Sequence, residues 1–173
     1  MAFTFLAADG VEVGRSLVEE DRFDDVRQAR KLADERKMVL LLPEDVLAAP
    51  EASVDAKRET VRCDAIPRNL MGLDIGPRTV EEFARTLADA RTFLWNGPMG
   101  VFELEPFSSG TRGVAYAIAG ITHAFSVAGG GDSLAAIRKF GLEDGFDHLS
   151  TGGGASLEFL EGKTLPGIEV LQR

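Results

Sequence analysis

Cysteine, histidine and long apolar runs are scarce in this sequence, and each scarcity excludes a class of protein. The single cysteine, Cys63, rules out an internal disulfide and any zinc site built from cysteines. His123 and His148 stand far apart without histidine or cysteine partners, so they do not predict a metal site. No apolar run reaches the roughly 18 residues that a membrane-spanning helix needs.

Positive charge is also scarce. The chain has 19 Lys and Arg against 28 Asp and Glu, a net charge of −9. This balance argues against a basic face that binds nucleic acid or anionic lipid, so neither is expected as a partner. The opening residues 1–6 lack the basic region and cleavage site of a signal peptide. With Cys63 interpreted as a small, partly buried apolar side chain, we expect a cytoplasmic protein.

Glycine, in contrast, is abundant in the second half of the chain. Fifteen of the 19 glycines lie between Gly97 and Gly167, so this backbone must turn tightly or approach something closely. The 173 residues are 45% hydrophobic and 27% charged, which is typical of one globular domain.

Helix and strand patterns alternate along the chain and predict an α/β fold with a mostly parallel sheet. Phe3, Phe5 and Leu6 look like the interior of a helix at the start. The apolar run 38–42, stopped by Pro43, predicts a strand buried on both faces. Thr79 and Glu82 form an expected capping box. The further expected helices are 21–37, 79–90, 111–119, 132–140 and 155–161, and the further expected strands are 60–63, 92–95, 124–128 and 146–149.

A glycine turn follows the expected strand 92–95. Asn96 offers an amide there, and Glu103 offers a carboxylate that could accept hydrogen bonds from the hydroxyls of a ribose. By spacing alone, a Pro–Gly turn with a solvated glutamate is the simpler interpretation.

Two further strands run into glycine triplets that open helices. Residues 129–133 read Gly-Gly-Gly-Asp-Ser, and residues 152–154 are again three glycines. Bare N–H groups at a helix start form an anion site, where Asp132 could hold Mg²⁺ and Ser133 could donate to a phosphate. The plainer alternatives are that Asp132 or Ser133 is an N-cap and that the second triplet is a loop without a ligand. The repeated pattern favours a polyphosphate ligand.

Three common motifs are absent. Gly162-Lys163-Thr164 imitates a P-loop end, but Leu157 stands where the first glycine belongs. Leu134 replaces the last glycine of a dinucleotide fingerprint, and no G-x-S-x-G elbow is present.

Five stretches of the sequence resemble the C-terminal half of the phosphoglycerate kinase family, in order and along nearly the whole chain. They are residues 71–77, 95–103, 129–133, 148–158 and 160–167. The resemblance implies a Rossmann-like, three-layer parallel sheet with helices on both faces, truncated at its N-terminal side. It also implies that residues 1–173 are a partial nucleotide-binding, C-terminal domain of a phosphoglycerate kinase.

The resemblance further implies an activity. Members of the family transfer a phosphoryl group between 1,3-bisphosphoglycerate and ADP with Mg²⁺, giving 3-phosphoglycerate and ATP in glycolysis. By matched position, the resemblance places Leu17 and Leu73 in the adenine pocket, Asn96 and Glu103 at the ribose, and Pro98 and Val101 beside the nucleotide. It places Gly130, Gly131, Asp132 and Ser133 at the phosphates, with Asp132 also on the metal. Gly152, Gly153 and Gly154 would face the group in transfer.

The same resemblance implies what this chain lacks. The phosphoglycerate-binding domain and the first strands of the nucleotide domain, with their lysine-bearing loop, have no counterpart, so the chain alone is expected to be inactive and to expose an apolar sheet face. Two alternatives stay open: a non-catalytic nucleotide-binding or interaction module of the same ancestry, and an unrelated α/β enzyme that uses a sugar nucleotide or NAD.

Overall fold

The structure, a computed structural model, describes residues 1–171 and divides into two units along the chain. Unit 1 comprises Met1–Arg85 and Met99–Thr111, and unit 2 comprises Thr86–Pro98 and the residues from Arg112 onward. Among the helices of residues 1–171, none combines the length and the apolar character of a membrane-spanning segment.

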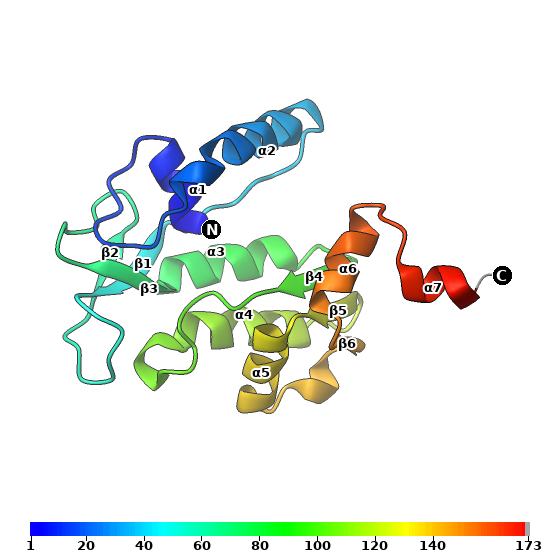
Figure 1. Cartoon of the computed structure of the whole chain (residues 1–173). Coiled ribbons are helices and arrows are strands. Elements are labelled where there is room, and N and C mark those ends of the chain that lie inside the picture. Colours follow the sequence, from blue (N-terminus) through cyan, green and yellow to red (C-terminus); the bar gives the residue numbers. More distant parts are fainter. Residues whose placement is uncertain (172–173) are drawn as a thin grey trace. The chain divides into compact units, whose positions relative to one another are not determined.

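Unit 1 contains an antiparallel sheet in which the central strand β1 has a neighbour on each side. The helix expected at the start of the chain and the helix expected at 21–37 are both confirmed, as is the strand near 60–63. The central strand and the third strand were not predicted. The elements that begin in unit 1 (Figure 1) are α1 (Ala2–Ala8), η1 (Glu20–Arg22), α2 (Phe23–Glu35), β1 (Asp45–Ala49), β2 (Glu59–Arg62), β3 (Met71–Ile75), α3 (Pro77–Leu87), η2 (Glu105–Phe107) and α4 (Ser109–Ala119).

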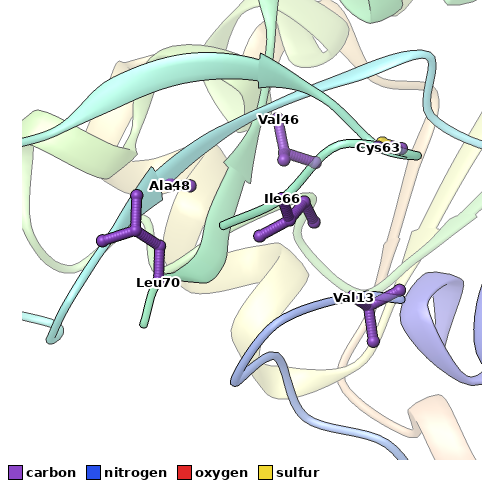
Figure 2. Close-up of a cluster of buried hydrophobic side chains, with 6 residues drawn as sticks. All are labelled: Val13, Val46, Ala48, Cys63, Ile66 and Leu70. Carbon is purple, nitrogen blue, oxygen red and sulfur yellow. The ribbon is translucent and has the colours of Figure 1, made fainter. Parts of the chain in front are cut away.

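A cluster of buried apolar side chains supports this sheet, and Figure 2 shows how they lie. Cys63 is one of them, at 4% exposure. Burial, together with the nearby charge of Asp45, raises the pKa of the Cys63 thiol to about 12. The expectation of an inert apolar side chain is confirmed. The full cluster is Val13, Val46, Ala48, Cys63, Ile66 and Leu70.

The capping box expected at Thr79 is wrong. The helix begins at Pro77, and Thr79 is fully buried inside its first turn. The cap comes instead from strand β1: the Asp45 carboxylate accepts the N–H of Thr79 at 2.8 Å and the N–H of Arg78 at 3.2 Å. A carboxylate distant in sequence satisfies the free N–H groups of the helix start, which local spacing could not reveal.

The buried strand expected at residues 38–42 is also wrong. These residues belong to no strand, and Val39 is 79% exposed. A strand needs a neighbour to take its N–H and C=O groups, and no described strand pairs with this run. The strand that does form begins after Pro43, at Asp45.

Unit 2 is built on a parallel sheet with strand order β4-β5-β6. The α/β class, with a parallel sheet flanked by helices, is confirmed, and each expected strand and helix of this region is present within about two residues. The remaining elements are β4 (Thr92–Asn96), β5 (Phe125–Gly129), α5 (Gly131–Phe140), η3 (Glu143–Gly145), β6 (His148–Ser150), α6 (Gly153–Leu160) and α7 (Pro166–Leu171).

Aromatic side chains anchor one face of the parallel sheet. Phe93 and Trp95 alternate with exposed residues along β4 and are buried. The Trp95 ring stacks on Phe146 with centroids 5.9 Å apart, and its Nε1–H donates to the Gly97 carbonyl at 2.7 Å. The indole therefore holds both the strand and the start of the turn that follows it.

Candidate functional site

The carboxyl ends of the three parallel strands lie side by side in unit 2. In the register of the sheet, Asn96 at the end of β4 pairs with Gly129 at the end of β5, and Gly129 pairs with Ser150 at the end of β6. Ligands of open α/β sheets bind at this edge. The glycine segments that follow β5 and β6 both start here.

The two glycine segments touch each other. A Cβ atom at Gly153 would lie 2.5 Å from both the Cα and the N of Gly130, so only glycine permits this approach. Gly130 itself has φ +94°, a backbone conformation that favours glycine. The two glycine segments that the sequence predicts as anion sites therefore have their backbones in contact.

The helices that follow these segments begin without side-chain caps. The N-cap residues are Gly130 for α5 and Gly152 for α6, so the alternative that Asp132 or Ser133 is the N-cap is wrong. The first backbone bonds of these helices are donated by Leu134 and Ser156. In the described part of the chain, the N–H groups of residues 131–133 and 153–155 donate to no backbone carbonyl. Two helix starts with open N–H groups therefore lie together on one surface, an arrangement suited to an anion.

Ser133 holds the turn after β4 to this surface. The Ser133 Oγ accepts the N–H of Gly97 at 2.7 Å, and the Ser133 side chain is fully buried. The Asn96 side-chain amide lies 3.8–3.9 Å from where a Cβ would stand at Gly130. Ser133 therefore has a structural role that the sequence analysis missed, since a hydrogen bond across 36 residues leaves no local pattern.

Asp132 is the one acidic residue in the first turn of α5, and it is exposed. Residues 1–171 contain no group of three or more His, Cys, Asp or Glu side chains that could hold a metal. Mg²⁺ usually takes one or two carboxylates and completes its shell with phosphate oxygens and water. A single carboxylate beside an anion site fits a metal that arrives with a polyphosphate.

Four predicted site residues belong to unit 1. Val101 donates its N–H to the Leu73 carbonyl at 2.8 Å and packs on the cluster that contains Leu73 and the fully buried Phe107. Glu103 is exposed and takes part in an interaction. Leu17 is 81% exposed, whereas Leu73 is buried.

Asp74, next to Leu73, is a buried carboxylate that the sequence analysis gave no role. Its carboxylate accepts the N–H of Gly110 at 2.7 Å and the N–H of the next residue, Ile75, at 3.0 Å. Burial raises its pKa to about 6, although these hydrogen bonds favour the charged form. A Cβ at Gly100 would lie 2.4 Å from its Oδ1, so the loop that carries Val101 and Glu103 is packed against this carboxylate. The strand that carries Asp74 was not predicted, so its burial could not be foreseen.

The family model described as phosphoglycerate kinase matches residues 1–163 of the chain. The phosphoglycerate kinase of Mycobacterium sp. (strain KMS) is 59% identical over 175 residues, which covers 99% of this chain and 42% of the relative. The phosphoglycerate kinase of Chlorobium phaeobacteroides (strain BS1) is 56% identical over 173 residues, covering 99% of this chain and 44% of the relative. The chain therefore spans less than half the length of these curated relatives.

Solved structures give the same result. Phosphoglycerate kinase from Coxiella burnetii matches with a TM-score of 0.94 and 48% identity, over 99% of this chain and 44% of that one. Phosphoglycerate kinase from Pyrococcus horikoshii OT3 matches with a TM-score of 0.81 and 38% identity, over 99% of this chain and 43% of that one.

Proposed function

Because the chain belongs to the phosphoglycerate kinase family, we propose that it carries the phosphate-binding part of a site for ADP or ATP with Mg²⁺. In a complete enzyme this site would serve phosphoryl transfer between 1,3-bisphosphoglycerate and ADP, giving 3-phosphoglycerate and ATP. The observation that carries the proposal is the contact between Gly153 and Gly130, which brings two uncapped helix starts together at the carboxyl edge of the sheet.

The backbone, rather than cationic side chains, would bind the phosphates. No lysine or arginine stands in residues 96–98, 129–133 or 150–156. The N–H groups of Gly131, Asp132 and Ser133 at α5, and those of Gly153 and Gly154 at α6, are the available donors. Gly152, Gly153 and Gly154 would face the group in transfer, and Gly130 gives the turn its shape.

The other proposed contacts belong to each unit by itself. In unit 2, Asn96 at the end of β4 would donate to or accept from the ribose, and Pro98 would lie beside the nucleotide. The roles that the resemblance implies for Leu17, Leu73, Val101 and Glu103 fall on unit 1 and stay predictions, with the Glu103 carboxylate as an acceptor only.

Asp132 is the residue that would hold the metal. Bound magnesium neutralises charge on the phosphate oxygens. The carboxylate of Asp132 lies in the first turn of α5, beside open N–H donors. The partial positive charge of a helix N-terminus stabilises a negative charge at this position.

Catalysis by this chain alone is not expected. Phosphoryl transfer needs cationic groups on the transferring oxygens and an aligned acceptor. The glycine segments supply neither, so we propose that 3-phosphoglycerate and 1,3-bisphosphoglycerate bind outside these segments.

The proposed metal role predicts a specific loss in the variant Asp132→Asn. We expect isothermal titration calorimetry to show MgADP binding by the unmodified chain and roughly tenfold weaker binding by the variant, about 1.4 kcal/mol. With EDTA in place of Mg²⁺, the two proteins should bind ADP equally, because the carboxylate acts through the metal.

The matched control is Asp144→Asn, which removes the same charge from an exposed position in η3 of unit 2. It should leave the affinity for MgADP unchanged. Equal weakening by both substitutions, or a loss at Asp132 that persists in EDTA, would contradict the metal role; no measurable MgADP binding by the unmodified chain would contradict the proposed function.

A further inference from the structure

The loop that carries Val101 and Glu103 is held by a buried hydroxyl group of unit 1. The Thr111 Oγ1 accepts the N–H of Met99 at 3.1 Å and the N–H of Gly100 at 3.2 Å. Thr111 lies in the first turn of α4 and is fully buried. A hydroxyl oxygen has two acceptor lone pairs, so this one side chain satisfies two consecutive backbone donors.

Strand β3 fixes the next residue of the same loop. The N–H of Val101 donates to the Leu73 carbonyl at 2.8 Å, and a Cβ atom at Gly100 would lie 2.6 Å from that carbonyl oxygen. The loop backbone is therefore in direct contact with the strand. Three successive N–H groups, at residues 99–101, donate to groups outside the loop, so the position of Val101 is set by α4 and β3.

The start of α4, which carries Thr111, is itself anchored to β3. The Asp74 carboxylate accepts the N–H of Gly110 at 2.7 Å, and the Ser109 side chain and the Thr111 N–H also donate to it. A carboxylate at a helix start satisfies N–H groups that have no partner within the helix. This anchor fixes the Thr111 side chain relative to the loop, so its hydroxyl is a rigid support.

A second threonine of unit 1 has the same geometry but supports a segment without predicted ligand contacts. Thr79 is also fully buried, and its Oγ1 accepts the N–H groups of Glu44 and Asp45 at 3.0 Å each. Neither of these two residues has a predicted role at the nucleotide. A comparison of Thr79 with Thr111 therefore separates support for the fold from support for the loop.

We propose that Thr111 is a positioning residue for nucleoside binding: its hydroxyl fixes residues 99–101 and, through them, the predicted contacts Val101 and Glu103. Thr111 acts through the loop and does not touch the ligand itself. The inference rests on the proposed nucleotide site and on the predicted roles of Val101 and Glu103. Removal of the hydroxyl should therefore weaken a ligand that contains a nucleoside and spare a bare diphosphate.

Calorimetry with two probes tests this role. MgADP carries a nucleoside, whereas magnesium pyrophosphate carries only phosphates, for which the glycine segments of unit 2 are proposed. Thr111→Val keeps the shape of the side chain and removes the hydroxyl. At a temperature where the variant is folded, we expect roughly tenfold weaker binding of MgADP and unchanged binding of magnesium pyrophosphate, because the loop loses its acceptor. Thr111→Ser retains a hydroxyl and should bind MgADP as the unmodified chain does.

Thr79→Val is the matched control, since it also removes a buried hydroxyl that accepts two consecutive N–H groups in unit 1. It should lower the stability of unit 1 and leave the affinity for MgADP unchanged. Hydrogen exchange should quicken at residues 99–100 in Thr111→Val and at residues 44–45 in Thr79→Val, which shows that each substitution releases its own segment.

Four outcomes would overturn the positioning role. They are unchanged MgADP affinity in Thr111→Val, an equal loss in Thr111→Val and Thr79→Val, an equal loss for both probes, and a Thr111→Ser variant as weak as Thr111→Val. In each of these cases the unmodified chain still binds MgADP, so the proposed nucleotide site stands. Failure of the unmodified chain to bind MgADP would contradict that site and the inference with it.

Discussion

Gly153→Ala should destabilise unit 2 by about 3 kcal/mol and separate the two glycine segments. The added methyl would lie 2.5 Å from the Cα and N of Gly130, and backbone atoms cannot rotate away as a flexible side chain can. Overpacking costs typically 1–3 kcal/mol, and contact with backbone places this case at the upper end of that range. Urea unfolding followed through Trp95, the single tryptophan, reports the stability of unit 2.

Gly154→Ala is the matched control for this substitution. It is the next residue of the same helix, and no atom lies within 4 Å of its added Cβ. Alanine is a better helix former than glycine, so this variant should be as stable as the unmodified chain or slightly more stable. If Gly153→Ala were also neutral, the contact between the segments would not be a constraint, and the basis of the anion site would be lost.

The same pair of variants bears on ligand binding. Gly153→Ala should weaken MgADP binding more than tenfold at temperatures where the protein is still folded, because the two sets of N–H donors no longer converge. Calorimetry below the unfolding transition measures this directly. Unchanged affinity would show that the two helix starts do not act on one ligand.

The contribution of Asp74 to the stability of unit 1 should fall as the pH rises from 4 to 7. Burial raises its pKa from the usual 3.8 to about 6, so the folded state binds a proton that the unfolded chain has already released. The stabilising contribution of the protonated carboxyl is fully present below about pH 3.8, and it is lost as the pH rises through 6. Two pKa units correspond to about 3 kcal/mol.

Asp74→Asn isolates this effect because an amide does not titrate. The difference in unfolding free energy between the unmodified chain and Asp74→Asn, from urea unfolding followed by circular dichroism, should fall by about 3 kcal/mol from pH 4 to pH 7. At pH 7 the amide of Gly110, which donates to Asp74, should exchange faster in the variant. A difference that grows with pH would mean that the hydrogen bonds outweigh burial.

Asp147→Asn provides a control of opposite sign. The Asp147 carboxylate accepts the N–H and the hydroxyl of Ser126, which hold its pKa below the usual range. Its stabilising contribution is present above about pH 3.8 and is lost as the pH falls through its folded pKa. The two substitutions should therefore change the pH dependence of stability in opposite directions.

The sequence alone predicted those elements whose formation depends on residues close together in the chain. Glycines 130 and 153, the strand before each of them and the helix after each could be located from residue type and order. The reason is that a helix start and a strand end are defined by neighbours in the chain.

Only the tertiary structure decided which distant groups satisfy one another. Asp45 caps a helix 33–34 residues away, Ser133 holds the turn after β4, and Asp74 accepts the N–H of Gly110, 36 residues away in the first turn of α4. The run at 38–42 has the composition of a buried strand but lacks a neighbouring strand, so it remains exposed. The composition of a segment determines which element it can form. Whether that element forms depends on hydrogen-bond partners that are distant in the chain, because buried backbone and carboxylate groups must be paired.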